Sequence, residues 1–389
     1  MSRRLLRFEL TNTRCIEFIE MQPSEELSFV MGDNGSGKSS LLDGLALLAD
    51  MVRGGLHEAA IALRRGLPVG PSIDLGTLFR RPDQPMRWTL EFSIDDQRWV
   101  YELGVRRTST DTGMAIHHER LARLDVDDGE VLLTDETGCR LRDGSEGRND
   151  WMPVTPSSGH PALGRAQDPL VYPQLHRVWS FICGIQLVRL NPVEMRGPAG
   201  RVSIDQLPDR LGRDFQSRVR ALLLKRPDRR EPWLDDLAAR TGWKEVRASD
   251  GDGDELMMVR EDATVGWSPL VYASDGQIVS AWLALLVQAP PASLSVLLFD
   301  EPALAVSSKG MEDVAEFLSL LAEDFQVIAA THSRETVDAH KHGDDTWVME
   351  RVWGAPARIT PLKEHPTGKK LARVVPPGSA AERAWGDRD

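Results

Sequence analysis

The segment VMGDNGSGKSSLL, residues 30–42, decides how the rest of the chain is interpreted. It fits the pattern G-x-x-x-x-G-K-[ST] between an apolar segment at 27–31 and a strongly helical segment at 40–51. In such a loop the glycines let consecutive backbone N–H groups turn toward phosphates, the lysine balances the β- and γ-phosphate charge, and the serine hydroxyl ligates magnesium. The positions that fit are Gly32, Gly37, Lys38 and Ser39.

The loop and the first helical turn after it are predicted to hold ATP and Mg²⁺. A glycine-rich turn with a chance lysine is the alternative, and the flanking strand and helix disfavour it. The predicted magnesium ligand in this segment is the hydroxyl of Ser39. The residues predicted to surround the phosphates are Gly32, Asn34, Gly35, Gly37, Lys38, Ser39 and Ser40.

A second apolar segment, SVLLFDEP at residues 295–302, ends in two carboxylates. In a phosphate-loop protein the aspartate at such a strand end, here Asp300, holds magnesium, and the following Glu301 polarises the attacking water. The next apolar segment is followed by His332, which is placed to reach a γ-phosphate. We predict that Glu301, His332 and Lys38 are the catalytic residues.

Two weaker signals complete the predicted nucleotide site. Arg14 lies in the tripeptide NTR at 12–14 and reaches the phosphates if the first strands fold back beside the loop; the alternative is a surface arginine. Ser274 and Gly276 precede a helix predicted over 278–288, so that a hydroxyl, backbone N–H groups and the helix dipole form an anion site. The tripeptide SDG at 274–276 is also typical of an ordinary turn with a helix cap. Its position just upstream of the segment 295–302, which ends in two carboxylates, favours the anion site.

Composition sets the class of protein. The chain has 389 residues, a formal net charge of -12, 41% hydrophobic and 27% charged residues. These values predict a globular protein, and the acidity argues against a uniformly basic surface for nucleic acid while leaving a local basic patch open. The three cysteines have no disulfide or zinc spacing. No apolar run is long enough to cross a membrane, and we predict a cytoplasmic protein without a membrane partner.

The order of predicted elements indicates an α/β fold. Short strands lead into the phosphate loop, alternation over 87–105 predicts a hairpin, and further strands up to 134 add an antiparallel layer. Residues 135–167 have an irregular composition, and helices are predicted over 205–225 and 231–241. We expect one head over 1–375. Its parts are a nucleotide-binding core at 1–135 and 260–365 and a helical or irregular insertion at 136–259, and a flexible tail follows at 376–389.

The chain resembles a known family at this point. A phosphate loop, a long insertion, Ser-x-Gly-Gln, Leu-Leu-Phe-Asp-Glu-Pro and Thr-His-Ser follow one another as in the ABC-type ATPase heads of the RecF, SMC and OLD group, and most of all as in their compact single-chain AAA members. The NTR tripeptide at 12–14 resembles their Asn-x-Arg element, and the segment 116–121 resembles a Glu-x-Leu element of the compact members. The resemblance covers about residues 4–348 and implies a P-loop NTPase head with a mixed central sheet, an antiparallel β layer and a helical lobe.

The resemblance also implies a mechanism. ATP held by the phosphate loop, Asp300 and Glu301 of one head is covered by Ser274 and Gly276 of a second head, which gives an ATP-dependent homodimer that hydrolysis reopens. In that mechanism His332 is the switch residue.

Two positions depart from the family pattern. The glutamine expected to join magnesium and water is not clearly marked, and Gln84 is a candidate. After Asp-Glu-Pro the family usually has a Glu and a Leu-His-Pro element, whereas residues 303–308 are ALAVSS. The second departure puts the dimer-facing loop and the rate of hydrolysis in doubt.

The functional hypothesis is an ATPase whose head dimerisation controls a partner effector, a nuclease or a toxin, in DNA repair or anti-phage defence. The alternative is a nucleotide-dependent DNA-binding or scaffold protein with negligible hydrolysis. A transporter ATPase subunit is a weaker alternative, because the NTR element and the insertion favour the RecF-like branch.

Overall fold

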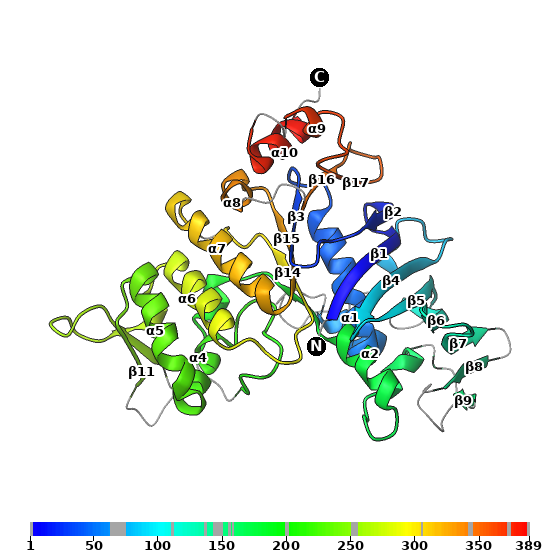
Figure 1. Ribbon diagram of the computed structural model, residues 1–389, viewed down its shortest axis with the longest axis horizontal. Coiled ribbons are helices and arrows are strands. Elements are labelled where there is room, and N and C mark those ends of the chain that lie inside the picture. The colour runs from blue at the N-terminus through cyan, green and yellow to red at the C-terminus, as the bar shows by residue number, and fades with distance from the viewer. Residues whose placement is uncertain are drawn as a thin grey trace.

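The central feature of the computed structural model is a helical layer held between two sheets (Figure 1). Helices α1 (Lys38–Ala62) and α2 (Pro173–Cys183) share one apolar core with both sheets. The structure describes residues 3–62, 75–109, 113–135, 138–142, 151–154, 157, 159–198, 202–249, 256–304, 306–340, 345–371 and 375–386.

The six-stranded sheet has the order β10-β14-β15-β3-β16-β17, in which the first five strands are parallel and β17 is antiparallel. Strands β3, β14 and β15 are buried along their whole length, as expected for a sheet with helices on both faces. Because these strands run in parallel, their carboxyl ends meet at one edge of the sheet. The strands are β10 (Ile185–Val188), β14 (Val296–Asp300), β15 (Gln326–Thr331), β3 (Leu27–Met31), β16 (Thr346–Glu350) and β17 (Arg358–Pro361).

The eight-stranded sheet is antiparallel throughout, in the order β2-β1-β4-β5-β6-β7-β8-β9. The predicted hairpin is confirmed, with Ile94 opposite Gln97 at its turn. Alternate residues of β4 are buried, so one face of this sheet packs on α1 and α2. The strands are β1 (Arg3–Thr13), β2 (Ile16–Met21), β4 (Met86–Ile94), β5 (Gln97–Arg107), β6 (Met114–Arg123), β7 (Glu130–Asp135), β8 (Gly138–Leu141) and β9 (Met152–Val154).

The opposite face of the six-stranded sheet carries a second apolar core and a helical lobe (Figure 1). Helices α6 (Asp275–Gln288) and α7 (Ser308–Asp324) pack there, and α4 (Phe215–Lys225) and α5 (Pro227–Thr241) lie outside them with a three-stranded sheet. That sheet consists of β11 (Glu245–Ala248), β12 (Met257–Arg260) and β13 (Ser268–Pro269). The short helices are η1 (Leu75–Leu78), η2 (Ala162–Arg165), α3 (Pro192–Met195), η3 (Leu270–Tyr272), α8 (Arg334–Ala339) and α9 (Gly368–Leu371).

The segment 136–259, expected as an insertion outside the core, is divided between four parts of the molecule, and its helix α2 belongs to the layer between the two sheets. Its strand β10 pairs with β14 inside the six-stranded sheet, and β8 and β9 extend the antiparallel sheet. Only its later part, with α4, α5 and β11, belongs to the helical lobe. Strands of three or four residues carry too little alternation to be assigned to a sheet from sequence, and tertiary pairing decides their place.

The C-terminal segment differs from the expected flexible tail at 376–389. Residues 377–386 form helix α10 (Pro377–Gly386), whose Ala380, Ala381 and Ala384 are buried in the second core. The carboxylate of Asp338 in α8 accepts hydrogen bonds from the N–H groups of Gly378, at 2.6 Å, and Ser379, at 3.1 Å. These bonds satisfy the N-terminal donors of the helix and fix it to the fold.

Ala381→Asp tests this docking. The substitution places a carboxylate in an apolar contact, and we expect it to lower the free energy of unfolding by about 2–4 kcal/mol. Urea denaturation followed by circular dichroism measures the change. Arg383→Asp, at an exposed position of the same helix, is the control. Equal stability of both variants and the parent would show that the helix contributes nothing to the fold.

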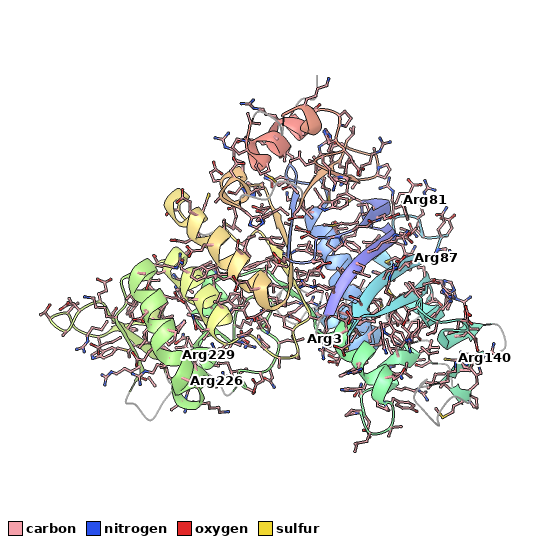
Figure 2. The ribbon with its side chains drawn as sticks, in the orientation of Figure 1. Arg3, Arg81, Arg87, Arg140, Arg226 and Arg229 are labelled. Carbon is pink, nitrogen blue, oxygen red and sulfur yellow. The ribbon has the colours of Figure 1, made fainter. Side chains whose placement is uncertain are left out.

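No helix in the described part of the chain combines the length and the apolar character that a membrane crossing requires. Of the arginines labelled in Figure 2, Arg226 and Arg229 lie on the helical lobe, and Arg81, Arg87 and Arg140 lie on the side of the antiparallel sheet. Arg226 and Arg229, at the start of α5, both lie near the carboxylate of Asp228, at 3.4 and 3.5 Å.

Candidate functional site

The phosphate loop joins β3 to α1 at the carboxyl edge of the six-stranded sheet. Gly35 and Gly37 have φ of 79° and 113°, a region that favours glycine. A Cβ on Gly32 would lie 2.2 Å from the carbonyl oxygen of Met349 in β16. The loop therefore needs glycine at these three positions, for conformation at two and for close packing at the third.

Lys38 folds back over the loop at the start of α1. Its Nζ donates to the carbonyl oxygens of Gly32, at 2.7 Å, and Asp33, at 3.2 Å, and lies 3.7 Å from the Glu301 carboxylate. Burial lowers the pKa of Lys38, and the nearby carboxylates of Glu301 and Asp300 oppose that shift. The ammonium group is thus held at the loop by partners that an anionic ligand can replace.

The two carboxylates at the end of β14 face different partners. Asp300 accepts a hydrogen bond from the Ser39 hydroxyl, at 3.2 Å through Oδ1. Glu301 binds Nδ1 of His332 through Oε2, at 2.8 Å. The structure therefore brings together the side chains of Lys38, Ser39, Asp300, Glu301 and His332.

Glu301 has an unusual backbone. Its φ of 55° lies in the left-handed region, which costs a non-glycine residue about 1 kcal/mol or more. Its N–H nevertheless donates to the carbonyl of Ala330 in β15 at 2.8 Å. The strand pairing and the His332 contact together hold Glu301 in a conformation that turns its carboxylate toward Lys38.

The NTR tripeptide forms the turn between β1 and β2, where Asn12 and Arg14 have φ of 58° and 50°. Arg14 binds Asp43 of α1 through Nη1 at 2.5 Å, so the predicted return of the first strands beside the phosphate loop occurs. Asn12 instead holds the segment before β4, because its amide bonds the backbone of Arg81 and Gln84.

Ser274 and Gly276 lie at the start of α6 in the helical lobe. Ser274 and Gln277 form a capping box, in which the Ser274 hydroxyl accepts from the Gln277 N–H and Gln277 Oε1 accepts from the Ser274 N–H at 3.0 Å. Both predicted residues line a hollow of about 590 Å³ together with residues of α5, α7 and the loop before α7, among them Arg240 and Ser307. The predicted anion site thus faces a hollow of the helical lobe rather than the phosphate loop.

Arg189 and Asp43 were missed by sequence reasoning. Arg189 directly follows β10 and donates to Oδ2 of Asp300 from Nε, at 2.7 Å, and from Nη2. The same Nη2 lies 3.6 Å from Oδ1 of Asp43. The sequence signal that could have indicated Arg189 was its position after a short apolar strand.

Gln84, the candidate for the glutamine that joins magnesium and water, lies in the turn before β4. Arg189 is the residue that reaches Asp300 from the neighbouring strand.

The Glu-x-Leu segment, residues 119–121, has a structural role. Glu119 in β6 is fully buried and accepts from the N–H groups of Ala162, at 2.6 Å, and Leu163, at 3.0 Å, and from the Tyr101 hydroxyl, at 2.9 Å. Burial raises the pKa of Glu119, and these donors oppose the shift. Glu119 therefore positions η2 against the antiparallel sheet.

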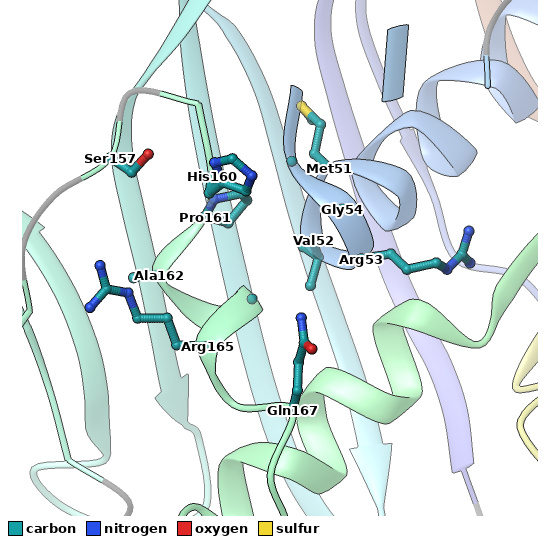
Figure 3. Close-up of a pocket in the computed structure, with 12 residues that line it drawn as sticks. Met51, Val52, Arg53, Gly54, Ser157, His160, Pro161, Ala162, Arg165 and Gln167 are labelled. Carbon is teal, nitrogen blue, oxygen red and sulfur yellow. The ribbon is translucent and has the colours of Figure 1, made fainter. Parts of the chain in front are cut away.

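A second cavity, of about 300 Å³, lies beside η2 and the bend of α1 at Gly54 and Gly55 (Figure 3). Arg53 borders it but extends toward α2, where it donates to the carbonyl of Cys183 at 2.6 Å. At 1.5 Å per residue this cavity lies about 24 Å along α1 from the phosphate loop. It is separate from the site formed by Lys38 and Asp300.

The donor set at the sheet edge fits a magnesium–nucleotide complex. The hydroxyl of Ser36 is buried and has no hydrogen-bond partner in the described part of the chain, which leaves it available to a ligand. Ser39 and Asp300 supply hard oxygen ligands of the kind that Mg²⁺ prefers, and the loop N–H groups and Lys38 supply donors for phosphate.

The comparisons with known proteins agree on the fold. A family model described as "AAA domain, putative AbiEii toxin, Type IV TA system" matches residues 27–338. No curated protein matches the chain.

Two solved structures are similar over nearly the whole chain. The crystal structure of the SmcHead bound to the C-winged helix domain of ScpA has a TM-score of 0.58 and 14% identity, and the match covers 95% of this chain and 100% of that one. The Smc head domain with an extended coiled coil, bound to the C-terminal domain of ScpA derived from Pyrococcus furiosus, has a TM-score of 0.50 and 11% identity, with 96% and 99% covered. At these identities the likeness shows the fold, and the predicted ABC-type head is confirmed. The chain therefore belongs to the AAA-domain family whose model spans residues 27–338, and it is built as an ABC-type ATPase head.

Proposed function

We propose that this protein binds ATP with Mg²⁺ at the phosphate loop and hydrolyses it. The observation that carries the proposal is the convergence of Lys38, Ser39, Asp300, Glu301 and His332 at the carboxyl ends of three adjacent parallel strands. Ser39 and Asp300 hold the metal, which neutralises phosphate charge. Glu301 accepts the proton of the attacking water, and His332 orients Glu301 through the 2.8 Å hydrogen bond.

The active form in this proposal is a homodimer. Ser274 and Gly276 present a helix N-terminus at a hollow of the helical lobe, and that hollow is lined by residues of α5, α6, α7 and the loop before α7. A second copy can place this helix end against the γ-phosphate at the first copy's loop, where N–H groups and the helix dipole favour negative charge. Two such sites then close together and reopen after hydrolysis.

The closing and opening of the dimer is proposed to control a partner effector, a nuclease or a toxin, in anti-phage defence or DNA repair. The family description names a putative toxin of a type IV system, which supports a defence role. The similar SmcHead structure is bound to ScpA, which supports the use of such a head as a platform for another protein.

Mixing two inactive variants tests the composite site. Gly276→Asp adds a second carboxylate, after that of Asp275, to the first turn of α6, where the helix dipole favours negative charge, but it repels the triphosphate. We expect neither Gly276→Asp nor Lys38→Ala to release phosphate alone. Mixed in equal amounts, the two chains should recover about a quarter of the parent rate, because half of randomly paired dimers then contain one intact site of two.

Gly276→Ala is the matched control and should keep the parent rate. Phosphate release of the mixture at the sum of the separate rates would contradict the composite site. Steady-state release is measured at several protein concentrations, since dimerisation makes the rate per chain rise with concentration.

The second candidate function, a nucleotide-dependent DNA-binding or scaffold protein, is favoured by the loop after Glu301. Residues 303–308 replace the family's usual acidic element, and Leu304 in this loop is 70% exposed. A loop of this composition offers no carboxylate to the dimer face. Phosphate release measured with and without DNA separates the two functions, because a scaffold binds DNA with ATP and turns over negligibly in both conditions.

A further inference from the structure

Arg189 lies against Asp300, one of the two predicted magnesium ligands. Its side chain extends from the end of β10 and donates two N–H groups to Oδ2 of Asp300. Its Nη2 also lies 3.6 Å from Asp43, so one guanidinium bridges two carboxylates. The side chains of Asp43 and Asp300 are only 5% and 2% exposed, whereas that of Arg189 is 24% exposed.

The other oxygens of both carboxylates are occupied from the nucleotide side. Oδ2 of Asp43 accepts from Arg14, at 2.5 Å, and Oδ1 of Asp300 accepts from Ser39, at 3.2 Å. Buried carboxylates are strongly destabilising unless a cation lies beside them. Arg189 is therefore the counter-ion shared by the two aspartates and lies on the oxygen of Asp300 that Ser39 leaves open.

We propose that Arg189 competes with Mg²⁺ for Asp300 and has to be displaced from it when the metal binds. Two cations that share one carboxylate repel each other at a distance of a few ångströms, and the repulsion is strong where the carboxylate is 2% exposed. Arg189 is the more exposed partner, so its side chain can move away while Asp300 stays in place. The competition raises the concentration of metal that the site requires. The inference rests on the proposed function, which brings Mg²⁺ to Asp300.

Metal titration of Arg189→Gln tests the competition. Binding of Mn²⁺, a spectroscopic substitute for Mg²⁺, is followed by electron paramagnetic resonance with the full chain, first without nucleotide and then with ATP. Removing the guanidinium should lower the half-saturating metal concentration about tenfold or more, because a like charge within a few ångströms of the metal is lost. Arg189→Lys should shift it in the same direction by less, since an ammonium cannot donate the same pair of N–H groups.

Arg210→Gln is the matched control. Arg210 pairs with Asp50, another buried aspartate of α1, seven residues beyond Asp43. This variant removes a guanidinium that contacts helix α1 outside the site, and its metal titration should match that of the parent. If Arg189→Gln does not fold, the smaller decrease in the half-saturating metal concentration of Arg189→Lys still tests the competition.

The expected shift without nucleotide supports the competition directly. An unchanged or raised half-saturating concentration in Arg189→Gln and Arg189→Lys overturns it and leaves Arg189 as a structural brace. The proposed function fails separately, if the parent chain binds no ATP at saturating metal. A lower half-saturating metal concentration in the Arg189 variants, together with a parent chain that binds no ATP, would support the competition for Asp300 and contradict the proposed ATPase function.

Discussion

Lys38→Ala is expected to lower the affinity for ATP by about two orders of magnitude. The ammonium group of Lys38 is held at the phosphate loop by two backbone carbonyls, of Gly32 and Asp33, and a bound phosphate replaces these neutral partners with a charged one. A charge-assisted contact contributes about 1.5–3 kcal/mol, and at about 1.4 kcal/mol per factor of ten the loss of one such contact near the upper end of this range accounts for the expected factor. Equilibrium titration with a fluorescent ATP analogue measures it.

The fold should survive this substitution. Burial lowers the pKa of Lys38, which means that the folded protein disfavours the charged form, so its removal relieves a cost as well as breaking contacts. Lys244→Ala, which removes an exposed lysine 3.5 Å from Asp262, should bind ATP like the parent. ATP affinity within threefold of the parent in Lys38→Ala would mean that the loop does not hold the nucleotide.

The core of the site could be predicted from sequence because its elements are local. The phosphate loop lies between a strand that is buried at every residue and a long helix, and Asp300 and Glu301 follow a second fully buried strand. Parallel pairing through β15 then places the ends of these strands at one edge, as the prediction requires. Their roles in binding and hydrolysis stay predictions.

Arg189 could not be placed from sequence, because its position depends on the pairing of β10. This strand has four residues and lies more than 100 residues before β14 in the chain, so nothing local indicates that the two are neighbours. The strands β8 and β9, within the segment expected to be irregular at 135–167, and helix α10, within the expected tail at 376–389, were missed for a related reason. Short strands and an alanine-rich helix gain their stability from tertiary packing rather than from a periodic apolar pattern.

Glu301→Gln is expected to bind ATP like the parent and to hydrolyse it about 10²–10⁴-fold more slowly, because an amide cannot accept the proton of the attacking water. Glutamine has nearly the same shape as glutamate, so the contact with His332 and the fold should remain. Phosphate release measures the rate, and the fluorescent ATP analogue measures binding. Glu20→Gln, in β2 beside Arg7, is the control and should hydrolyse ATP like the parent.

The oligomeric state of Glu301→Gln decides whether chemistry opens the dimer. If hydrolysis is the step that separates the two copies, blocking it should trap them with ATP between them, and light scattering after gel filtration should give twice the monomer mass with ATP and the monomer mass without it. The combination with Gly276→Asp should return the mass to that of the monomer, because the second copy then repels the γ-phosphate. A Glu301→Gln protein that binds ATP, does not hydrolyse it and stays monomeric would retain the catalytic role of Glu301 and reject the composite site.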